Sequence, residues 1–335
     1  MDVSAHEGLN LDAFGDWLSQ WRSSILAGSR PYGCFTWRDE AAPNLLHIND
    51  LVWIGWAQDE LQPSARQRGE WIETINSFQH PEGGYYANPP FESHSWPHAT
   101  WRALMSLNML EGRPRYPVAV LEPLCDVETC RQWVAGHGSG PPRLPHHRYA
   151  LGAFVAPMAR DEAWLSAFLD AILALQNPKT GLWPTAEGAD SLSPTFLFST
   201  LLIKLGGQVP RPELVTDTTL DMERPSAWFG RSGPGFHDMD GAFLLEHLSR
   251  ETGHRREDCL AALRRMHASL GRIWREQRQQ VFNRNPHRTL AVHGICSVLN
   301  GALPEAQSRY PWRFVYHATQ FIRVPPTAGQ IDGAQ

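Results

Sequence analysis

Two aspartates separated by one residue are the strongest candidates for acid–base chemistry in this chain. Asp238 and Asp240 lie in HDMDGAFLLEHLSRETG, where we expect a helix to begin. The positive end of a helix dipole lowers the pKa of a carboxyl group, whereas burial and a second carboxylate raise it. We expect Asp240, or else Asp238, to act as a general acid, with His237 as a third catalytic residue that orients it by hydrogen bonding. The competing interpretation is that Asp238 only caps the helix.

A second set of polar and aromatic residues falls at the other expected helix starts and in the loops before them. In a protein made of repeated helix pairs, such positions meet at one end of a central cavity. The residues predicted to bind the substrate there are Tyr86, His94, Trp96, His98, His147, Arg148, Arg288 and His293. Equivalent positions without an assigned role are His47, Asn49, Asp50, Ser193 and Thr195, whereas His287 could join Arg288 in binding an anionic group. Arginine and histidine suit a diphosphate or a carboxylate, although each residue could instead be a helix cap or a solvated side chain.

The chain offers no recognisable metal-binding pattern. Its five cysteines are scattered, without a CxxC pair or the ligand spacing of a zinc site. His94 and His98 are four residues apart, but Pro97 between them breaks a shared helical face. We therefore expect no metal site and no cofactor, with Mg²⁺ as the exception if the substrate is a diphosphate.

An internal repeat indicates which elements hold these residues in place. The sequence QNPKTGLW (Gln176–Trp183) closes an amphipathic run, and QHPEGGYY (Gln79–Tyr86) closes an earlier one. In each turn the glutamine amide can bond the open carbonyls at the helix end, the glycine can adopt the left-handed conformation, and the aromatic can pack on the next unit. About six helix–turn–helix units follow one another at roughly 50-residue spacing. The sequence therefore predicts an all-α fold, a single (α/α)6 toroid over residues 1–325, followed by a disordered tail over 326–335.

Residues 75–110 resemble the repeat of protein prenyltransferase β-subunits and squalene–hopene-type terpenoid cyclases, with the sequence INSFQHPEGGYYANPPFESHSWPHATWRALMSLNML. The segment QNPKTGLW is similar to the QW motif of the cyclases, and DMDG is similar to the DxDD motif of class II cyclases. In that motif the middle aspartate protonates an alkene or an epoxide, and the resemblance places this role on Asp240. The chain departs from both patterns, because Gly241 stands where DxDD ends and Ala242 where the prenyltransferases have their zinc-binding cysteine.

Composition argues against several other classes of protein. The formal net charge is −5, with 30 Lys and Arg against 35 Asp and Glu, so we expect no basic face for nucleic acid. The longest apolar runs fall short of the ~20 residues that span a bilayer, so we expect no integral membrane segment. The N-terminal residues show no signal-peptide pattern, and we expect a cytoplasmic protein. The sequence does not say whether a partner subunit is needed.

Three functions fit these expectations. The first is an enzyme that resembles terpenoid cyclases or prenyltransferases and acts on an isoprenoid, as an isomerase or lyase if it is cyclase-like. Its central cavity would be lined by aromatic rings, Phe236 among them. The second is a carbohydrate-active (α/α)6 enzyme, a glycoside hydrolase or uronate lyase, with Asp240 as acid and His and Arg side chains binding the sugar. The third is a toroid that binds a peptide or a metabolite without catalysis. A closed, dry aromatic cavity favours the first function. An open cleft with exposed tryptophan, and an aspartate facing Arg and His, favours the second. A filled centre favours the third.

Overall fold

Helices make up nearly all the regular structure of the described part of the chain. The computed structural model describes residues 8–38, 40–87, 96–135, 162–184, 190–230, 233–283 and 285–316. The α-helices are α1 (Leu11–Gly28), α2 (Leu45–Ala57), α3 (Ala65–Asn76), α4 (Trp96–Met109), α5 (Val127–Val134), α7 (Glu162–Ala174), α8 (Leu192–Lys204), α9 (Pro212–Asp221), α10 (Phe236–Thr252), α11 (Arg256–Val281) and α12 (Pro286–Ala302). Two short 3₁₀ helices, Ala119–Cys125 and Pro304–Ala306, and one antiparallel pair of two-residue strands, β1 (Trp183–Pro184) and β2 (Asp190–Ser191), accompany them. The predicted all-α class is confirmed, and the predicted tail lies outside the described residues.

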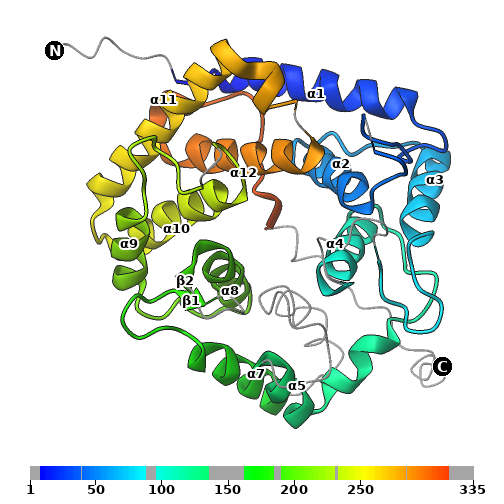
Figure 1. The fold of residues 1–335 in the computed structure, drawn as a ribbon, viewed down its shortest axis with the longest axis horizontal. Coiled ribbons are helices and arrows are strands. Elements are labelled where there is room, and N and C mark those ends of the chain that lie inside the picture. The colour runs from blue at the N-terminus through cyan, green and yellow to red at the C-terminus, as the bar shows by residue number, and fades with distance from the viewer. Residues whose placement is uncertain are drawn as a thin grey trace.

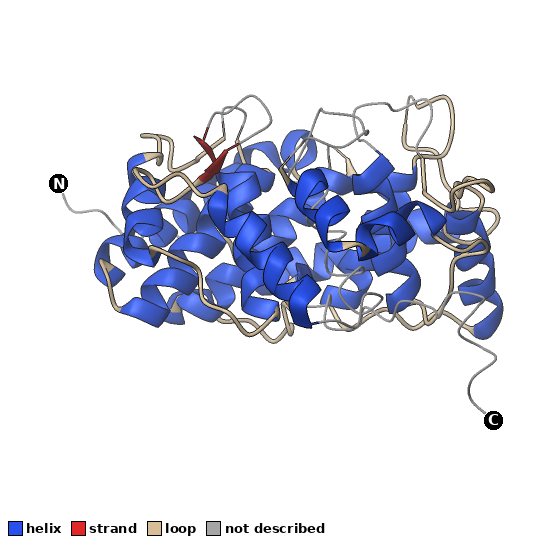
Figure 2. Cartoon of the chain, turned by 90° about the horizontal axis from the view of Figure 1, so that it is seen from below, coloured by secondary structure: helices blue, strands red, loops and turns tan. Residues whose placement is uncertain are grey.

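The helices form two concentric series (Figure 1). α2, α4, α8, α10 and α12 lie toward the centre, and α1, α3, α5, α7, α9 and α11 lie around them. Neighbouring inner helices pack against one another in the order α4, α2, α12, α10, α8. Figure 2 shows that the β1–β2 pair lies at one face of this layer of helices. The inner helices therefore present their ends to the same two faces of the molecule.

Burial follows the position of a helix in these two series. Every residue of α2 except Trp56 is buried, whereas the outer helix α3 buries only Trp71, Thr74, Ile75 and Asn76. The sequence predicts this difference, since the segment that forms α3 is charged and the segment that forms α8 is apolar. Even so, none of the helices in the described ranges has the length and apolar character needed to cross a membrane.

The two Gln–Gly–aromatic turns share one geometry, which differs from the prediction in one respect. Gln79 Nε2 donates to the carbonyl oxygens of Gly84 and Tyr116, at 2.8 Å each. Gln176 makes the equivalent two bonds at 2.8 and 2.9 Å. The amide therefore joins its own turn to the loop that leads to the next outer helix, instead of bonding the carbonyls at the helix end. The glycines do adopt the left-handed conformation, with φ of +66° at Gly84 and +71° at Gly181.

Each turn also sets the start of the inner helix that follows it. The backbone N–H of Tyr86 donates to Thr100 Oγ1 in α4 at 2.9 Å. The backbone N–H of Trp183 donates to Thr195 Oγ1 in α8, also at 2.9 Å. The repeated turn thus positions the first turns of α4 and α8, two of the helices that bound the central cavity.

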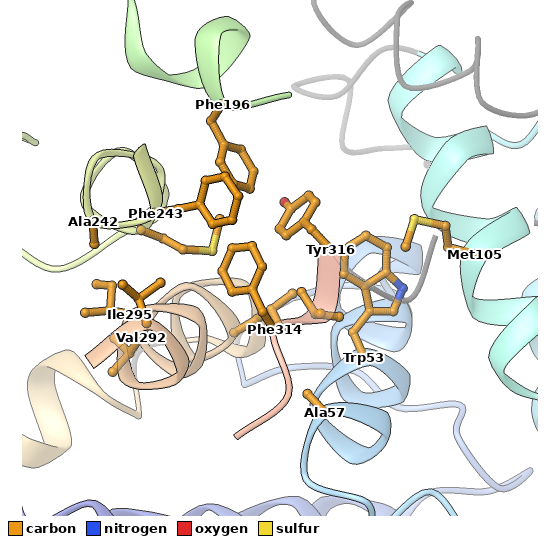
Figure 3. Packing of buried hydrophobic residues seen from close by; sticks show 14 of the residues in the cluster. Trp53, Ala57, Met105, Phe196, Ala242, Phe243, Val292, Ile295, Phe314 and Tyr316 are labelled. Carbon is orange, nitrogen blue, oxygen red and sulfur yellow. The ribbon is translucent and has the colours of Figure 1, made fainter. Parts of the chain in front are cut away.

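The last described segment of the chain fills part of the centre (Figure 3). Phe314 and Tyr316 lie among side chains of the inner helices, at 6% and 4% exposure. The Phe314 ring stacks on Phe243 of α10 at 4.9 Å, and the Tyr316 ring meets Phe196 of α8 edge-on at 4.7 Å. Each such aromatic pair contributes about 0.5–1.5 kcal/mol beyond its burial. The centre of the molecule is therefore a packed apolar core with a cavity beside Tyr316.

Candidate active site

Asp240 is a buried carboxyl group in the first turns of α10. It is 2% exposed, and Ser193 Oγ at the start of α8 donates a hydrogen bond of 2.6 Å to its Oδ2. Burial, opposed by this hydrogen bond and reinforced by Asp238, raises the pKa of Asp240 to about 8. Asp240 is therefore a neutral carboxylic acid at neutral pH. Because Oδ2 accepts from Ser193, the proton of that acid belongs on Oδ1.

Asp238 lies only two residues away, but its carboxyl group binds the backbone of the loop before α10. Its Oδ1 accepts the backbone N–H groups of Phe229 and Gly230, at 2.7 and 3.0 Å. Its Oδ2 accepts the N–H of Gly235 at 2.8 Å. Burial raises its pKa, and the three backbone hydrogen bonds oppose that rise. Asp238 thus ties the loop before α10 to the start of the helix, as the capping interpretation expects.

A cavity of about 130 Å³ lies between four inner helices and the last described segment. It is enclosed on part of its boundary by aromatic rings and on part by polar groups. The described residues that line it are His98, Trp101 and Arg102 of α4, Ser193, Phe196 and Leu197 of α8, Phe236 and Asp240 of α10, His287 of α12, and Tyr316. Asp240 therefore has a cavity beside it in which a substrate group could accept its proton.

Arg102 and His287 line this cavity, and the buried Asp50 behind them pairs with both. Arg102 of α4 makes an ion pair with Asp50 of α2, and both side chains are fully buried. Nδ1 of His287 lies 3.3 Å from Asp50 Oδ2. The guanidinium carbon of Arg102 lies 3.7 Å from the centroid of the Trp53 ring. The cation–π contact and the ion pair together fix the position of Arg102.

These pairings hold the three groups in defined protonation states. Burial would raise the pKa of Asp50, but Arg102 and His287 outweigh it and hold that pKa below its ordinary value. Burial also lowers the pKa of His287, against the opposing effect of Asp50. At neutral pH the cavity wall therefore carries a neutral His287 and a neutral Asp240, with an ionised Asp50 behind it.

Two of the residues predicted from the sequence lie together at this cavity. Asp240 and His98 both line it, and the His98 ring lies 5.7 Å from that of Trp101. His237 is exposed at the start of α10 and does not line the cavity. His237 is the second residue of α10 and is exposed there, whereas Asp240 lies almost one turn further along the helix and is buried.

The other predicted residues within the described ranges lie elsewhere. Tyr86 is fully buried and its hydroxyl donates to Asn76 Oδ1 at 2.8 Å. His293 is fully buried against Trp312, with ring centroids 5.0 Å apart, and burial lowers its pKa to about 3. Trp96 and Arg288 are partly buried and do not line the cavity. The remaining predicted residues, His94, His147 and Arg148, fall outside the described residues.

Several cavity residues are absent from the sequence-based prediction. They are Trp101, Arg102, Phe196, Leu197 and Tyr316. Ser193, Phe236 and His287 were expected near the cavity and do line it. Asp50 was expected there too, but it lies behind the wall as the partner of Arg102. Asp50 and Arg102 carry a usable signal, because each is a charged residue inside an apolar helical run, LLHINDLVWIGWA and ATWRALMSLNML. A charge in such a run must be paired, and the two charges of opposite sign are each other's partner. Tyr316 carries no comparable signal.

The chemistry of the site rests on these side chains. Comparison of the chain with protein-family models, with curated proteins and with solved structures gave no match. Within the described ranges, no group of three or more His, Cys, Asp and Glu residues is placed to hold a metal ion. The arrangement offers a buried acid, a paired and buried guanidinium, a neutral imidazole and a wall of aromatic rings.

Proposed function

We propose that this protein is an enzyme that resembles terpenoid cyclases, with Asp240 as the general acid that protonates a carbon–carbon double bond or an epoxide of an isoprenoid. The observation that carries the proposal is a carboxyl group with a pKa of about 8 on the wall of a cavity. A carboxyl group with an ordinary pKa has almost no proton to give at pH 7. Asp240 keeps its proton up to about pH 8, which suits it to donate at neutral pH.

The aromatic wall supports this chemistry. Protonation of an alkene leaves a carbocation, and Trp101, Phe196, Phe236 and Tyr316 line the cavity in which it would form. The face of each ring attracts a cation by about 0.5–2 kcal/mol, depending on desolvation. The hydrogen bond from Ser193 stabilises the carboxylate that Asp240 becomes. The aromatic rings therefore stabilise the carbocation, and Ser193 stabilises the Asp240 carboxylate.

The size of the cavity limits which part of a substrate reacts there. An engineered apolar cavity of about 150 Å³ in another protein binds benzene. The cavity of about 130 Å³ in this protein is nearly as large. It therefore accommodates about one five-carbon isoprenoid unit, with the reacting double bond next to Asp240.

The finer architecture belongs to the same proposal. Two concentric series of helices, with the inner ones packed in sequence around a centre, support an (α/α)6 toroid. In such a fold each helix pair buries its faces only against its neighbours, and the inner helices bring their first turns to one end of the ring. Ser193, Asp240 and His287 lie in such first turns.

The test is turnover of a substrate panel by matched variants. The panel contains farnesyl and geranylgeranyl diphosphate, squalene and its epoxide, and uronate oligosaccharides. Asp240→Asn keeps the shape of the side chain but has no acidic proton, so we expect turnover of the isoprenoid to fall by about 10²–10⁴-fold. Asp221→Asn, at the exposed end of α9, is the control and retains turnover. Full activity of Asp240→Asn would remove the proposal.

A carbohydrate-active enzyme is the second candidate. The observation in its favour is that Asp240 shares its cavity with His98, Arg102 and His287, groups that bind sugar hydroxyls and carboxylates. Against it, Trp101 is 4% exposed, which leaves little ring surface for a sugar to stack on. Turnover of a uronate oligosaccharide, lost in Asp240→Asn, would favour this candidate. Binding of a panel member without turnover would favour a protein that binds a small molecule without catalysis.

A further inference from the structure

His287 faces the same cavity as Asp240 and is held in a fixed orientation. It lies in the first turn of α12, a helix that packs against both α2 and α10. Nδ1 of its ring lies 3.3 Å from Asp50 Oδ2. The ring also packs on Phe236 of α10, with centroids 4.2 Å apart. An imidazole paired with a buried carboxylate in this way is oriented for proton transfer at its other nitrogen.

We propose that Asp50 and His287 form the base of this site, with His287 Nε2 accepting the proton that leaves the substrate after Asp240 has protonated it. This inference rests on the proposed function, because it assigns the second proton transfer of the same reaction. It gives the cavity two catalytic groups, an acid from α10 and a base from α12.

The pairing with Asp50 determines which nitrogen acts. When Nδ1–H donates to Asp50, the lone pair of the neutral ring is on Nε2. Asp50 stays a carboxylate because Arg102 neutralises it, and Arg102 is itself held against Trp53. When His287 becomes an imidazolium, the Asp50 carboxylate stabilises the new positive charge. Asp50 is thus a positioning residue, and His287 is the catalytic one.

The charges around His287 keep it neutral before it reacts. The titratable and charged groups that face it are Asp50 and His47 of α2 and Arg102 of α4, with Asp240 of α10 on the wall of the same cavity. Burial lowers the pKa of His287 despite Asp50, and Arg102 and His47 lower it further. Burial raises the pKa of Asp240, whereas it lowers that of His287. The cavity therefore holds a neutral acid and a neutral base at pH 7, which is the combination that a two-step proton transfer requires.

The reaction balances without a co-reactant. Asp240 transfers its proton to one carbon of a double bond, so a C–H bond forms, the π bond is lost, and a carboxylate and a carbocation remain. His287 Nε2 then removes a proton from a carbon next to the cation, and the electron pair of that C–H bond forms the new double bond. The imidazolium returns a proton to Asp240 through water. The net change of these steps is an isomerisation. When a second double bond of the substrate attacks the cation before the proton leaves, its π electrons form a C–C bond, the cation moves to the other carbon, and the net change is a cyclisation.

A matched pair of histidine variants tests the assignment with geranylgeranyl and farnesyl diphosphate as probes. His254 has the same partnership outside the cavity, since its Nε2 lies 2.9 Å from Asp217 Oδ1 and its side chain is 33% exposed. We expect His287→Gln to lose about 10²-fold in kcat and to lose the acid limb of the pH–rate profile. Its residual products should shift toward alcohols, because water then traps a cation that lacks its base. His254→Gln should match the wild type in all three readouts.

The outcomes separate the two proposals. If Asp240→Asn is inactive while His287→Gln keeps the acid limb and the product spectrum, the base assignment is overturned and the acid assignment stands. If Asp240→Asn keeps full activity, or no isoprenoid is turned over, the proposed function fails. The base can then be judged without a substrate by nitrogen NMR of histidine-labelled protein, with His287→Gln to assign the signal. The assignment requires Nδ1–H and an unprotonated Nε2 at pH 7, and any other state overturns it.

Discussion

At the residue scale, the two aspartates of α10 show how a difference of two positions separates structure from chemistry. Asp238 accepts three backbone N–H groups, so its charge serves to hold the loop before the helix. Asp240 accepts one hydroxyl hydrogen bond and faces a cavity, so its burial raises its pKa to about 8. Asp238 alone holds the loop against the start of α10, so Asp240 is not needed for that purpose and remains a neutral acid.

The raised pKa of Asp240 predicts a pH-dependent cost in stability. The pKa is about 8 in the folded protein and near 3.8 in the unfolded chain, so the folded state binds this proton more tightly. The stability that this difference contributes is fully present below the unfolded pKa and is lost as pH rises through the folded one. We expect Asp240→Asn to become more stable than the wild type as pH rises from about 4 to 8, by at most about 1.4 kcal/mol per pH unit. Urea unfolding at several pH values measures the difference in the free energy of unfolding between this variant and the wild type. A difference that does not change with pH would contradict the raised pKa.

At the scale of elements, one turn design starts two helices of the site. The glutamine of each turn bridges to a loop some distance along the chain, and the aromatic residue two positions after the glycine is tied to α4 or α8 by a threonine. The sequence predicts the helices and the left-handed glycines, because both depend on local pattern. The partner of the glutamine amide was predicted wrongly, because Tyr116 lies 37 residues from Gln79 and no local rule brings it there.

The glycine of the first turn should be irreplaceable, whereas a helix-ending glycine should not. Gly84 has φ of +66°, and a Cβ there would lie 1.7 Å from the carbonyl oxygen of Pro117. We expect Gly84→Ala to destabilise the fold by about 3 kcal/mol, from backbone strain and the clash together. Gly253 after α10 has φ of +74° with no atom within 4 Å of such a Cβ, so Gly253→Ala should cost only about 1 kcal/mol. Chemical unfolding measures both, and equal losses would show that the contact with Pro117 is not what constrains the turn.

At the scale of the whole molecule, the last described segment of the chain lies at the centre, among the inner helices. Phe314 and Tyr316 fill space that the sequence-based prediction assigned to the substrate cavity, and what remains is about 130 Å³ (Figure 3). Local pattern cannot predict this, because no signal in the sequence places residues 312–316 among the inner helices. Asp240 and His98 were predicted for the cavity because both lie near starts of inner helices. Arg102 was missed because it lies a turn deeper in α4, where sequence reasoning expects apolar packing.

Proton donation by Asp240 requires that its carboxyl group be protonated at neutral pH, and infrared difference spectroscopy measures this directly. The carbonyl stretch of a protonated carboxyl group is separate from the bands of carboxylates, and subtracting the spectrum of Asp240→Asn isolates it. We predict a protonated-carboxyl band at pH 7 that is lost as the pH is raised through about 8, and that Asp221→Asn leaves unchanged. A carboxylate at pH 7 whose band titrates near the ordinary value of 3.8 would contradict the account.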